Sequence, residues 1–198
     1  MPDTFRAVAV VTAAGSAERF GGKKLLAPVA GEPLLDHTIR SLLEGGVAEV
    51  IVVVSAEARR ELARDVSAMD DAHVRVLENA DPSRGMFSSI QVGVASAVGD
   101  ALLVLPGDMP YVRPETVRAL IAKFRERPAI VSPRYKGKRG HPVVMPLSLR
   151  DEIAATASTA NLHDVIHHHE DERVDLEVED AGVNRDVDTR ADLERPKG

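Results

Sequence analysis

The sequence predicts an α/β fold in which helices cover both faces of a parallel sheet. Apolar, β-branched runs alternate with amphipathic segments from the N-terminal region to residue 132. Several runs are continuously apolar, as at 7–11, 50–54 and 101–105, which is typical of strands that are buried on both faces. The chain has 198 residues, of which 44% are hydrophobic and 28% charged, so a single globular domain over 1–198 is expected.

The alternation gives the expected elements in order. Strands are expected near 6–12, 49–55, 73–78, 100–105 and 129–132, and helices near 33–45, 57–67, 86–98 and 114–126. After Pro133 the pattern is less regular, with a basic stretch, helices near 147–156 and 161–169, and a strand at 173–178. No repeat or low-complexity linker separates this part, so it is expected to add elements to the same sheet. Ligands of such sheets gather beyond the carboxyl ends of the strands.

Composition argues against several classes of function. A formal net charge of −6 argues against bulk affinity for nucleic acid, and 3% aromatic residues without Trp argue against base-stacking platforms. No apolar stretch approaches the roughly 20 residues that a membrane helix needs. The absence of Cys excludes a disulfide framework, a thiolate metal site and a cysteine nucleophile. The N-terminus lacks the charged-then-apolar pattern of a secretion signal, so a cytoplasmic protein is expected.

The segment Val8–Pro28 joins a short apolar run to a glycine-rich, cationic loop, which is the layout of an anion-binding loop. Its small residues are Ala13, Ala14 and Gly15, its further glycines are Gly21 and Gly22, and its cations are Arg19, Lys23 and Lys24. Small residues let backbone N–H groups approach a polyphosphate, and the three glycines permit positive φ angles. The spacing fits neither G-x-G-x-x-G nor G-x-x-x-x-G-K-[ST], so a dinucleotide fingerprint and a Walker loop are not supported. The alternative is an ordinary turn with surface lysines.

Asp108 is a candidate metal ligand. It lies in the turn Pro106–Pro110, which follows the apolar run 102–105 and projects a carboxylate from the end of an expected strand. Mg²⁺ prefers carboxylate oxygens and takes its remaining ligands from water and substrate phosphates, so one or two aspartates suffice. The alternative is a turn residue, or the cap of the helix that is expected to begin near Pro114.

Two further carboxylates stand at positions i and i+2 near the C-terminus. In an extended segment Asp186 and Asp188 point to the same side, so both are candidates to share a metal ion with Asp108. The alternative is that Asp188 or Thr189 caps a helix over 190–194.

The histidines at 163 and 167–169 include an i, i+4 pair that suits a transition metal on a helix. The pair lacks the glutamate of an H-E-x-x-H motif, and three acidic residues follow it at 170–172. A solvated polar face is therefore the favoured interpretation of this run.

Five sequence blocks occur in order along nearly the whole chain. They are A-A-G-x-x-x-R-F-G-x-x-K-x-L from Ala13 with the following Gly31–Leu35, then Gly85–Ile90, Pro106–Pro110, Gly140–Pro142 and Asp186–Thr189. On these blocks the chain resembles the MobA-like NTP transferases, the nucleotidyltransferases related to molybdenum cofactor guanylyl- and cytidylyltransferases. The resemblance implies a three-layer α/β/α fold with a mostly parallel, mixed central sheet of the nucleotide-diphospho-sugar transferase kind.

The resemblance also implies roles for individual residues. The nucleotide would contact Ala13, Ala14, Gly15, Arg19, Lys24, Gly85, Ser88 and Ser89. Arg19 and Lys24 would hold the phosphates, and the block from Gly85 would line the base and ribose pocket; its alternative is a plain helix start. Asp108 would bind Mg²⁺ with Asp186 or Asp188 nearby, so that Arg19, Lys24 and Asp108 form the catalytic set. Arg139 and His141 are candidates for binding an anionic acceptor, although His141 is alternatively a turn residue held by Pro142.

The implied reaction is Mg²⁺-dependent transfer of NMP from an NTP to a phosphorylated acceptor, with release of pyrophosphate. The Ala-Ala-Gly opening resembles the cytidylyl branch and favours CTP, and the block from Gly137 to Pro142 makes molybdopterin the leading acceptor. The segment 156–162 replaces the glycine-and-acidic stretch expected for pterin binding, and Ala17 and Phe20 also depart from the family pattern.

Two other classes of function stay open. One is a nucleotide-binding accessory protein without turnover, which would assist maturation of a molybdoenzyme partner. The other is a nicotinamide- or flavin-dependent oxidoreductase, which the missing G-x-G-x-x-G disfavours. The sequence does not predict an oligomeric state.

Overall fold

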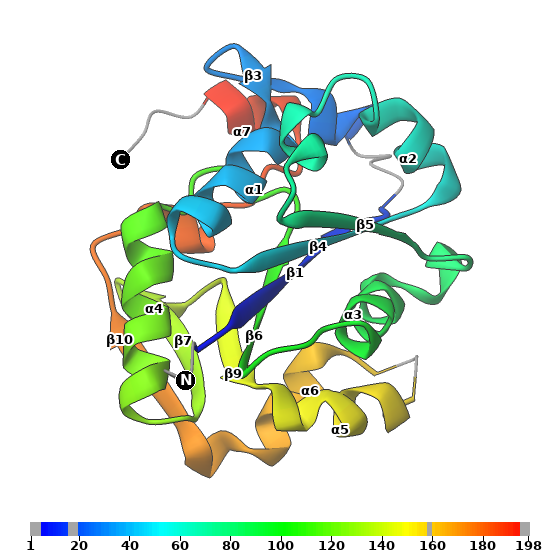
Figure 1. Ribbon diagram of the computed structural model, residues 1–198. Helices are drawn as coiled ribbons and strands as arrows, with labels where there is room; N and C mark the ends of the chain where they lie inside the picture. The colour runs from blue at the N-terminus through cyan, green and yellow to red at the C-terminus, as the bar shows by residue number, and fades with distance from the viewer. Residues whose placement is uncertain (1–4, 16–19, 158–159, 195–198) are drawn as a thin grey trace.

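The computed structural model describes residues 5–15, 20–157 and 160–194. Its central feature is an eight-stranded sheet within those ranges, with the strand order β10-β7-β9-β6-β1-β4-β5 and with β8 paired to β7 (Figure 1). The strands are β1 (Ala7–Ala13), β4 (Glu49–Val54), β5 (Val74–Glu78), β6 (Ala101–Pro106), β7 (Ile130–Tyr135), β8 (Lys138–Arg139), β9 (Val143–Pro146) and β10 (Arg173–Glu177).

The sheet is mixed, and most of its pairings are parallel. β1 pairs in parallel with β4 and β6, so that Val10 lies between Ile51 and Val104. β9 runs antiparallel to both β6 and β7, and β8 closes an antiparallel hairpin with β7. The mostly parallel, mixed sheet is confirmed. The strands β8 and β9 replace the irregular stretch that was expected after Pro133.

Helices form a layer on each face of the sheet (Figure 1). One layer contains α1 (Leu34–Glu44), α2 (Ala56–Leu62) and α4 (Pro114–Glu126), and the other contains α3 (Met86–Ala95), α5 (Arg150–Ala155) and α6 (Leu162–His168). The expected helix over 57–67 ends earlier, at Leu62, and a 3-10 turn, η3 (Ser67–Asp70), follows it. None of the helices in the described ranges reaches the length and apolar character that a membrane crossing requires.

Alternate residues of β1 supply the two halves of the core. Val8 and Val10 pack under α3, α5 and α6, whereas Ala9 and Val11 pack under α1 and α4. All four side chains are completely buried. The continuous apolar run thus forms a strand without a solvent face, as expected for the centre of a parallel sheet.

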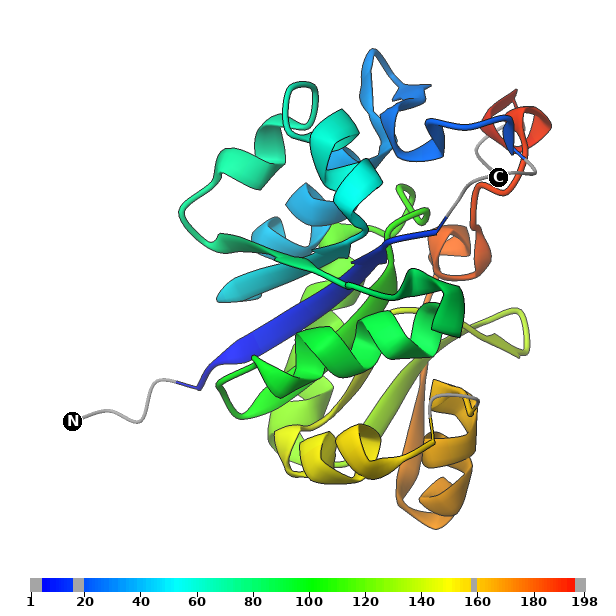
Figure 2. The same cartoon turned by 90° about the vertical axis from the view of Figure 1, so that its right-hand side faces the viewer.

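A smaller cluster connects the two ends of the described chain. Phe20 and Leu34 pack with Val187 just before α7 (Arg190–Glu194), and Leu193 of that helix lies against them. The short hairpin of β2 (Pro28–Val29) and β3 (Glu32–Pro33) completes the cluster. Figure 2 shows the result, with the red C-terminal helix beside the blue segment that follows β1.

The hairpin of β7 and β8 is fixed to the 3-10 turn η7 (Ala181–Asn184). The backbone N–H of His141 donates to the carbonyl oxygen of Val183 at 2.8 Å. A Cβ atom at Gly140 would lie only 2.1 Å from the same oxygen, a distance that two non-bonded atoms do not reach. Gly140 is therefore required for the close approach of the two backbones.

We expect Gly140→Ala to lower the free energy of unfolding by about 3 kcal/mol, because the two atoms nearest to the added methyl group belong to the rigid backbone of Val183. Urea-induced unfolding followed by circular dichroism measures this loss. Gly15→Ala is the matched control, because among the described atoms none lies within 4 Å of a Cβ atom at Gly15. Equal stability of the two variants would contradict the argument.

Candidate active site

The centre of the candidate site is an ammonium group held between two carboxylates. Lys24 belongs to the 3-10 turn η2 (Lys24–Leu26), and its Nζ atom lies 2.7 Å from Oδ2 of Asp108 and 3.1 Å from Oδ1 of Asp188. The side chains are 14%, 21% and 31% exposed, respectively, so the group is shielded from solvent but not sealed. Three segments that are remote in sequence thus meet at the carboxyl end of the sheet.

The turn after β6 holds Asp108 in place. The backbone N–H of Gly107 donates to the carbonyl oxygen of Thr12 in β1, and the Thr38 hydroxyl of α1 donates to the carbonyl oxygen of Gly107 at 3.0 Å. The carbonyl oxygen of Asp108 in turn accepts from the N–H of Val187 at 2.9 Å. The same turn therefore positions the Asp108 carboxylate and, through its bond to Val187, fixes the backbone next to Asp188.

Asp188 faces Lys24 because its neighbours provide the cap of α7. The Asp192 carboxylate accepts hydrogen bonds from the backbone N–H groups of Asp188 and Thr189 and from the Thr189 hydroxyl, at 3.2, 2.8 and 2.8 Å. This closes the first turn of the helix that the sequence predicts over 190–194. These bonds place Thr189 directly before the helix, at one of the two cap positions that the sequence offers, and Asp192 is a supporting residue that sequence reasoning missed.

Electrostatics favour the charged form of Lys24. Burial alone would lower the pKa of its ammonium, but hydrogen bonds and Coulomb attraction from Asp108 and Asp188 outweigh that effect and raise the pKa above its ordinary value. Oδ1 of Asp108 is buried and has no hydrogen-bond partner among the described atoms. A buried carboxylate oxygen without a donor has spare capacity for a cation.

The donors at this position fit a hard divalent cation in both chemistry and number. Mg²⁺ uses one or two carboxylates together with water and substrate phosphates, and Asp108 and Asp188 lie within reach of one cation. Asp186 is exposed to solvent, so the structure brings together two of the three predicted carboxylates. In the ranges that the structure describes, no three His, Cys, Asp or Glu side chains form a metal-holding group, and this includes the histidines of α6.

The structure describes the glycine-rich loop up to Gly15 and again from Phe20. Ala13 is buried at the end of β1, Ala14 is half-buried and Gly15 is exposed. Gly21 and Gly22 have positive φ angles of 85° and 88°, as the sequence predicts, whereas Gly15 does not. Arg19 lies outside the described residues, so its predicted contact with phosphate stays a prediction.

The block at the start of α3 has a structural role. Gly85 has a φ angle of 91° and immediately precedes the helix. The hydroxyl groups of Ser88 and Ser89 are buried, and the side-chain amide of Asn79 donates to both, at 2.9 and 3.0 Å. Ser88 also donates to the carbonyl oxygen of Gly85 at 2.7 Å. Contact of these residues with a base or ribose stays a prediction, and Asn79, which follows β5, is a second supporting residue that sequence reasoning missed.

The imidazole of His141 lies close enough to Asp108 and Asp186 to interact with their charges. Burial lowers the pKa of its imidazole, and this outweighs the opposing effects of the Val104 backbone, Asp108 and Asp186. Its Nδ1 atom is buried and has no hydrogen-bond partner among the described atoms. The neutral ring is therefore favoured, and an acceptor-binding role for it stays a prediction.

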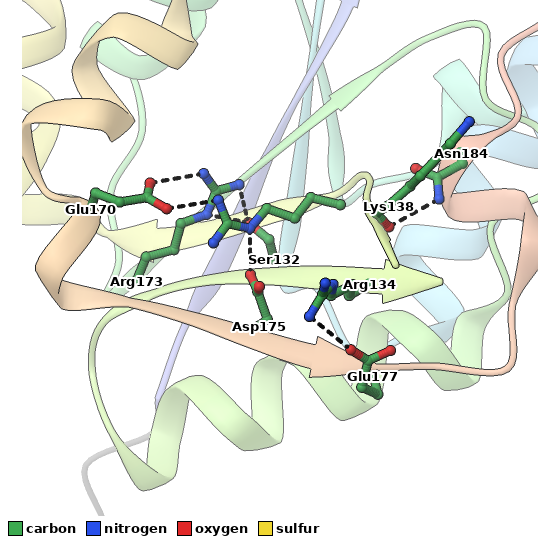
Figure 3. Close-up of polar contacts among 9 residues, drawn as sticks. Ser132, Arg134, Lys138, Glu170, Arg173, Asp175, Glu177 and Asn184 are labelled. Carbon is green, nitrogen blue, oxygen red and sulfur yellow. Dashed lines mark hydrogen bonds and ion pairs between the residues drawn. The ribbon is translucent and has the colours of Figure 1, made fainter. Parts of the chain in front are cut away.

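Arg139 belongs to a separate network of charges on β7, β8 and β10. Its guanidinium donates to Asp175 at 2.8 Å and to Glu170 at 2.7 Å, and these carboxylates raise its pKa. Figure 3 shows the network, in which Arg173 also reaches Glu170 and Arg134 pairs with Glu177. A surface hollow of about 410 Å³ is lined by Arg134, Gly137, Arg139 and Asp175. Arg139, which the sequence predicts to bind the acceptor substrate, is thus already paired with two carboxylates of this chain.

Comparison with known proteins identifies relatives of the whole chain. The family described as the MobA-like NTP transferase domain matches residues 9–174. The nicotine blue oxidoreductase of Paenarthrobacter nicotinovorans is 33% identical, with 91% of each chain covered. A probable molybdenum cofactor guanylyltransferase of Thermococcus kodakarensis is 29% identical, with 95% of this chain and 92% of the relative covered. The molybdenum cofactor cytidylyltransferase of Escherichia coli is 24% identical, with 93% of this chain and 92% of the relative covered.

The fold also matches solved structures. Rv0371c of Mycobacterium tuberculosis superposes with a TM-score of 0.81 at 25% identity, covering 96% of this chain and 97% of the other. A second structure of that protein is described as a complex with manganese, with a TM-score of 0.75, 25% identity and the same coverage. These matches support the nucleotide-diphospho-sugar transferase kind of fold that the sequence resemblance implies.

We expect His141 to make the protein less stable in acid. The unfolded chain binds a proton at the ordinary histidine pKa of 6.5, whereas the buried ring binds it only at lower pH. Between these two values the unfolded state holds more protons, so the free energy of unfolding falls as pH falls. Urea unfolding at a series of pH values should show a shallower acid loss for His141→Gln than for the wild type. His163→Gln is the matched control because this imidazole is exposed, and an unchanged slope in His141→Gln would contradict the argument.

Proposed function

The chain belongs to the MobA-like NTP transferase family and is a nucleotidyltransferase, and we propose that it transfers NMP from an NTP to a phosphorylated acceptor. The observation that carries this proposal is the contact of Lys24 with Asp108 and Asp188 beside a glycine-rich loop. That arrangement combines a phosphate-binding cation with two carboxylates suited to a divalent metal.

The reaction needs alignment and charge neutralisation more than covalent help from the protein. An oxygen of the acceptor phosphate attacks the α-phosphorus of the NTP, an O–P bond forms, and the bond to the bridging oxygen breaks. Pyrophosphate leaves with the electron pair of that bond. The acceptor phosphate is already ionised, so no general base is required. Lys24 would neutralise charge on the phosphates, and a bound divalent cation, with Mg²⁺ the expected one, would supply further electrophilic charge there.

The nucleotide and the acceptor are assigned by analogy. Relatives of the chain carry both guanylyl- and cytidylyltransferase names, and the Ala13-Ala14-Gly15 opening favours CTP. Molybdopterin is the proposed acceptor, with Arg139 and His141 as candidates for its anionic group. Because Arg139 already pairs with Asp175 and Glu170, an anionic acceptor would share its guanidinium with these carboxylates or compete with them for it.

One observation favours a second candidate function. A relative at 33% identity is named an oxidoreductase, and one fold can host unrelated chemistries. Oxidation of NADH or NADPH by the purified protein, followed at the nicotinamide absorbance, tests this candidate directly. A third candidate is an accessory protein that binds a nucleotide without turnover. The contact of Lys24 with Asp108 and Asp188 argues against this role, since simple nucleotide binding does not require two carboxylates.

We expect acceptor-dependent release of pyrophosphate with one nucleotide when CTP, GTP, ATP and UTP are each supplied with Mg²⁺ and molybdopterin. Asp108→Asn should lower the rate by at least about a hundredfold, because it removes charge from the reacting site while keeping the side-chain size. Circular dichroism serves as the control that the variant is folded. Full activity in the variant would contradict the role of Asp108, and release without acceptor would contradict a transferase.

The two C-terminal aspartates should differ in their effect. Asp188→Asn should cost about tenfold more activity than Asp186→Asn, because Asp188 contacts Lys24 and Asp186 is exposed to solvent. The same pyrophosphate assay, with kcat and KM determined separately, measures the difference. A larger loss in Asp186→Asn would assign the catalytic carboxylate to the other position.

A further inference from the structure

The position between Asp108 and Asp188 requires a cation whether or not a substrate is present. Two carboxylates that face one point repel each other, and partial burial weakens the screening of that repulsion by water. The Lys24 ammonium relieves it by contacting one oxygen of each group. The structure therefore places the Lys24 ammonium where the proposed reaction calls for a divalent cation.

The ammonium and a divalent cation cannot share this position. Carboxylate oxygens lie about 2.0–2.1 Å from bound Mg²⁺, whereas the Lys24 Nζ atom already lies 2.7 and 3.1 Å from the oxygens that it contacts. A cation between the same oxygens would lie against the ammonium, with like charges in contact. A cation that binds both carboxylates through these two oxygens therefore requires the ammonium to leave, whereas a cation on the unpartnered Oδ1 of Asp108 alone would not.

The lysine side chain is suited to such a departure. Its backbone is anchored, because the residues on either side of η2, Phe20 and Ala27, belong to the small cluster around Val187. Its four-carbon stem is flexible, and its ammonium is a compact charge that exchanges partners without a fixed geometry. The glycines that precede it, Gly21 and Gly22, have no described atom within 4 Å of an added Cβ atom. An ammonium leaving the carboxylates thus remains beside the loop expected to bind phosphate.

We propose that Lys24 is an internal counter-ion that occupies the metal position in the unliganded protein and is exchanged for the divalent cation when the NTP arrives. The phosphates attract the ammonium, its departure opens the two carboxylates, and the cation then enters. Metal and nucleotide consequently bind cooperatively, since each favours the same position of Lys24. This inference rests on the proposed function, because it assumes an NTP and a divalent cation as ligands.

The inference is tested by the binding of Mn²⁺ alone, followed as loss of the free-ion signal in electron paramagnetic resonance. Lys24→Met and Lys24→Gln remove the competing charge, so both should bind Mn²⁺ roughly tenfold more tightly than the wild type in the absence of nucleotide. Lys24→Arg keeps a cation and should not gain affinity. Lys123→Met is the matched control, since it removes an exposed lysine from an ion pair of 2.9 Å with Glu126.

Melting temperatures provide a second readout that does not depend on turnover. Without metal, Lys24→Met should melt below the wild type because the attraction of the ammonium for Asp108 and Asp188 is lost, and Mn²⁺ should raise its melting temperature more than that of the wild type. If Lys24→Met does not fold, Lys24→Gln and Lys24→Arg still make the comparison.

The outcomes separate this inference from the proposed function. If the wild type binds Mn²⁺ together with the α,β-methylene analogue of CTP, but the neutral variants gain no affinity for Mn²⁺ alone, the exchange is refuted and the transferase proposal stands. If no protein binds Mn²⁺ or the analogue in any combination, both are refuted. Tighter binding of Mn²⁺ by both neutral variants, with none in Lys24→Arg or Lys123→Met, supports the exchange.

Discussion

The arrangement of the site depends on the burial of β1 on both faces. Helices cover both faces of this strand, so its interior is closed to ligands, and the glycine-rich loop begins where it ends, after Ala13. β6 runs parallel to β1 and ends at the same edge, and this brings Asp108 to the loop. The C-terminal segment is held there through Val187, both by its packing and by its hydrogen bond to Asp108. The geometry of the candidate site is thus a consequence of strand order.

The sequence was sufficient for the parts that follow from local pattern. Continuous apolar runs located the parallel strands, and small residues with lysines located the loop near Lys24. The strand β9 was missed because its four residues carry no helix before them and pair antiparallel, by long-range contacts. The contacts of Asp192 with the Asp188 backbone, and of Asn79 with two buried serines, were missed because a single polar residue has no period that predicts its partner.

The site also shows why motif and structure carry different information. The block from Gly140 reads as a functional motif, yet its glycine is required by the approach of the Val183 backbone and its histidine donates a backbone hydrogen bond to the same residue. These contacts hold the segment that leads to Asp188. A residue can therefore belong to a functional block because of the backbone contacts that it makes possible. One fold can also carry unrelated chemistries, and one relative of this chain is named an oxidoreductase.

The distance in sequence between the partners of Lys24 has a consequence for synthesis of the protein. Its contact with Asp108 spans 84 residues and its contact with Asp188 spans 164. A chain still emerging from the ribosome cannot make the second contact until Asp188 has been synthesised. The growing chain consequently carries the glycine-rich loop long before it has the two carboxylates together. The three side chains of the candidate metal site are therefore brought together only after Asp188 has been synthesised.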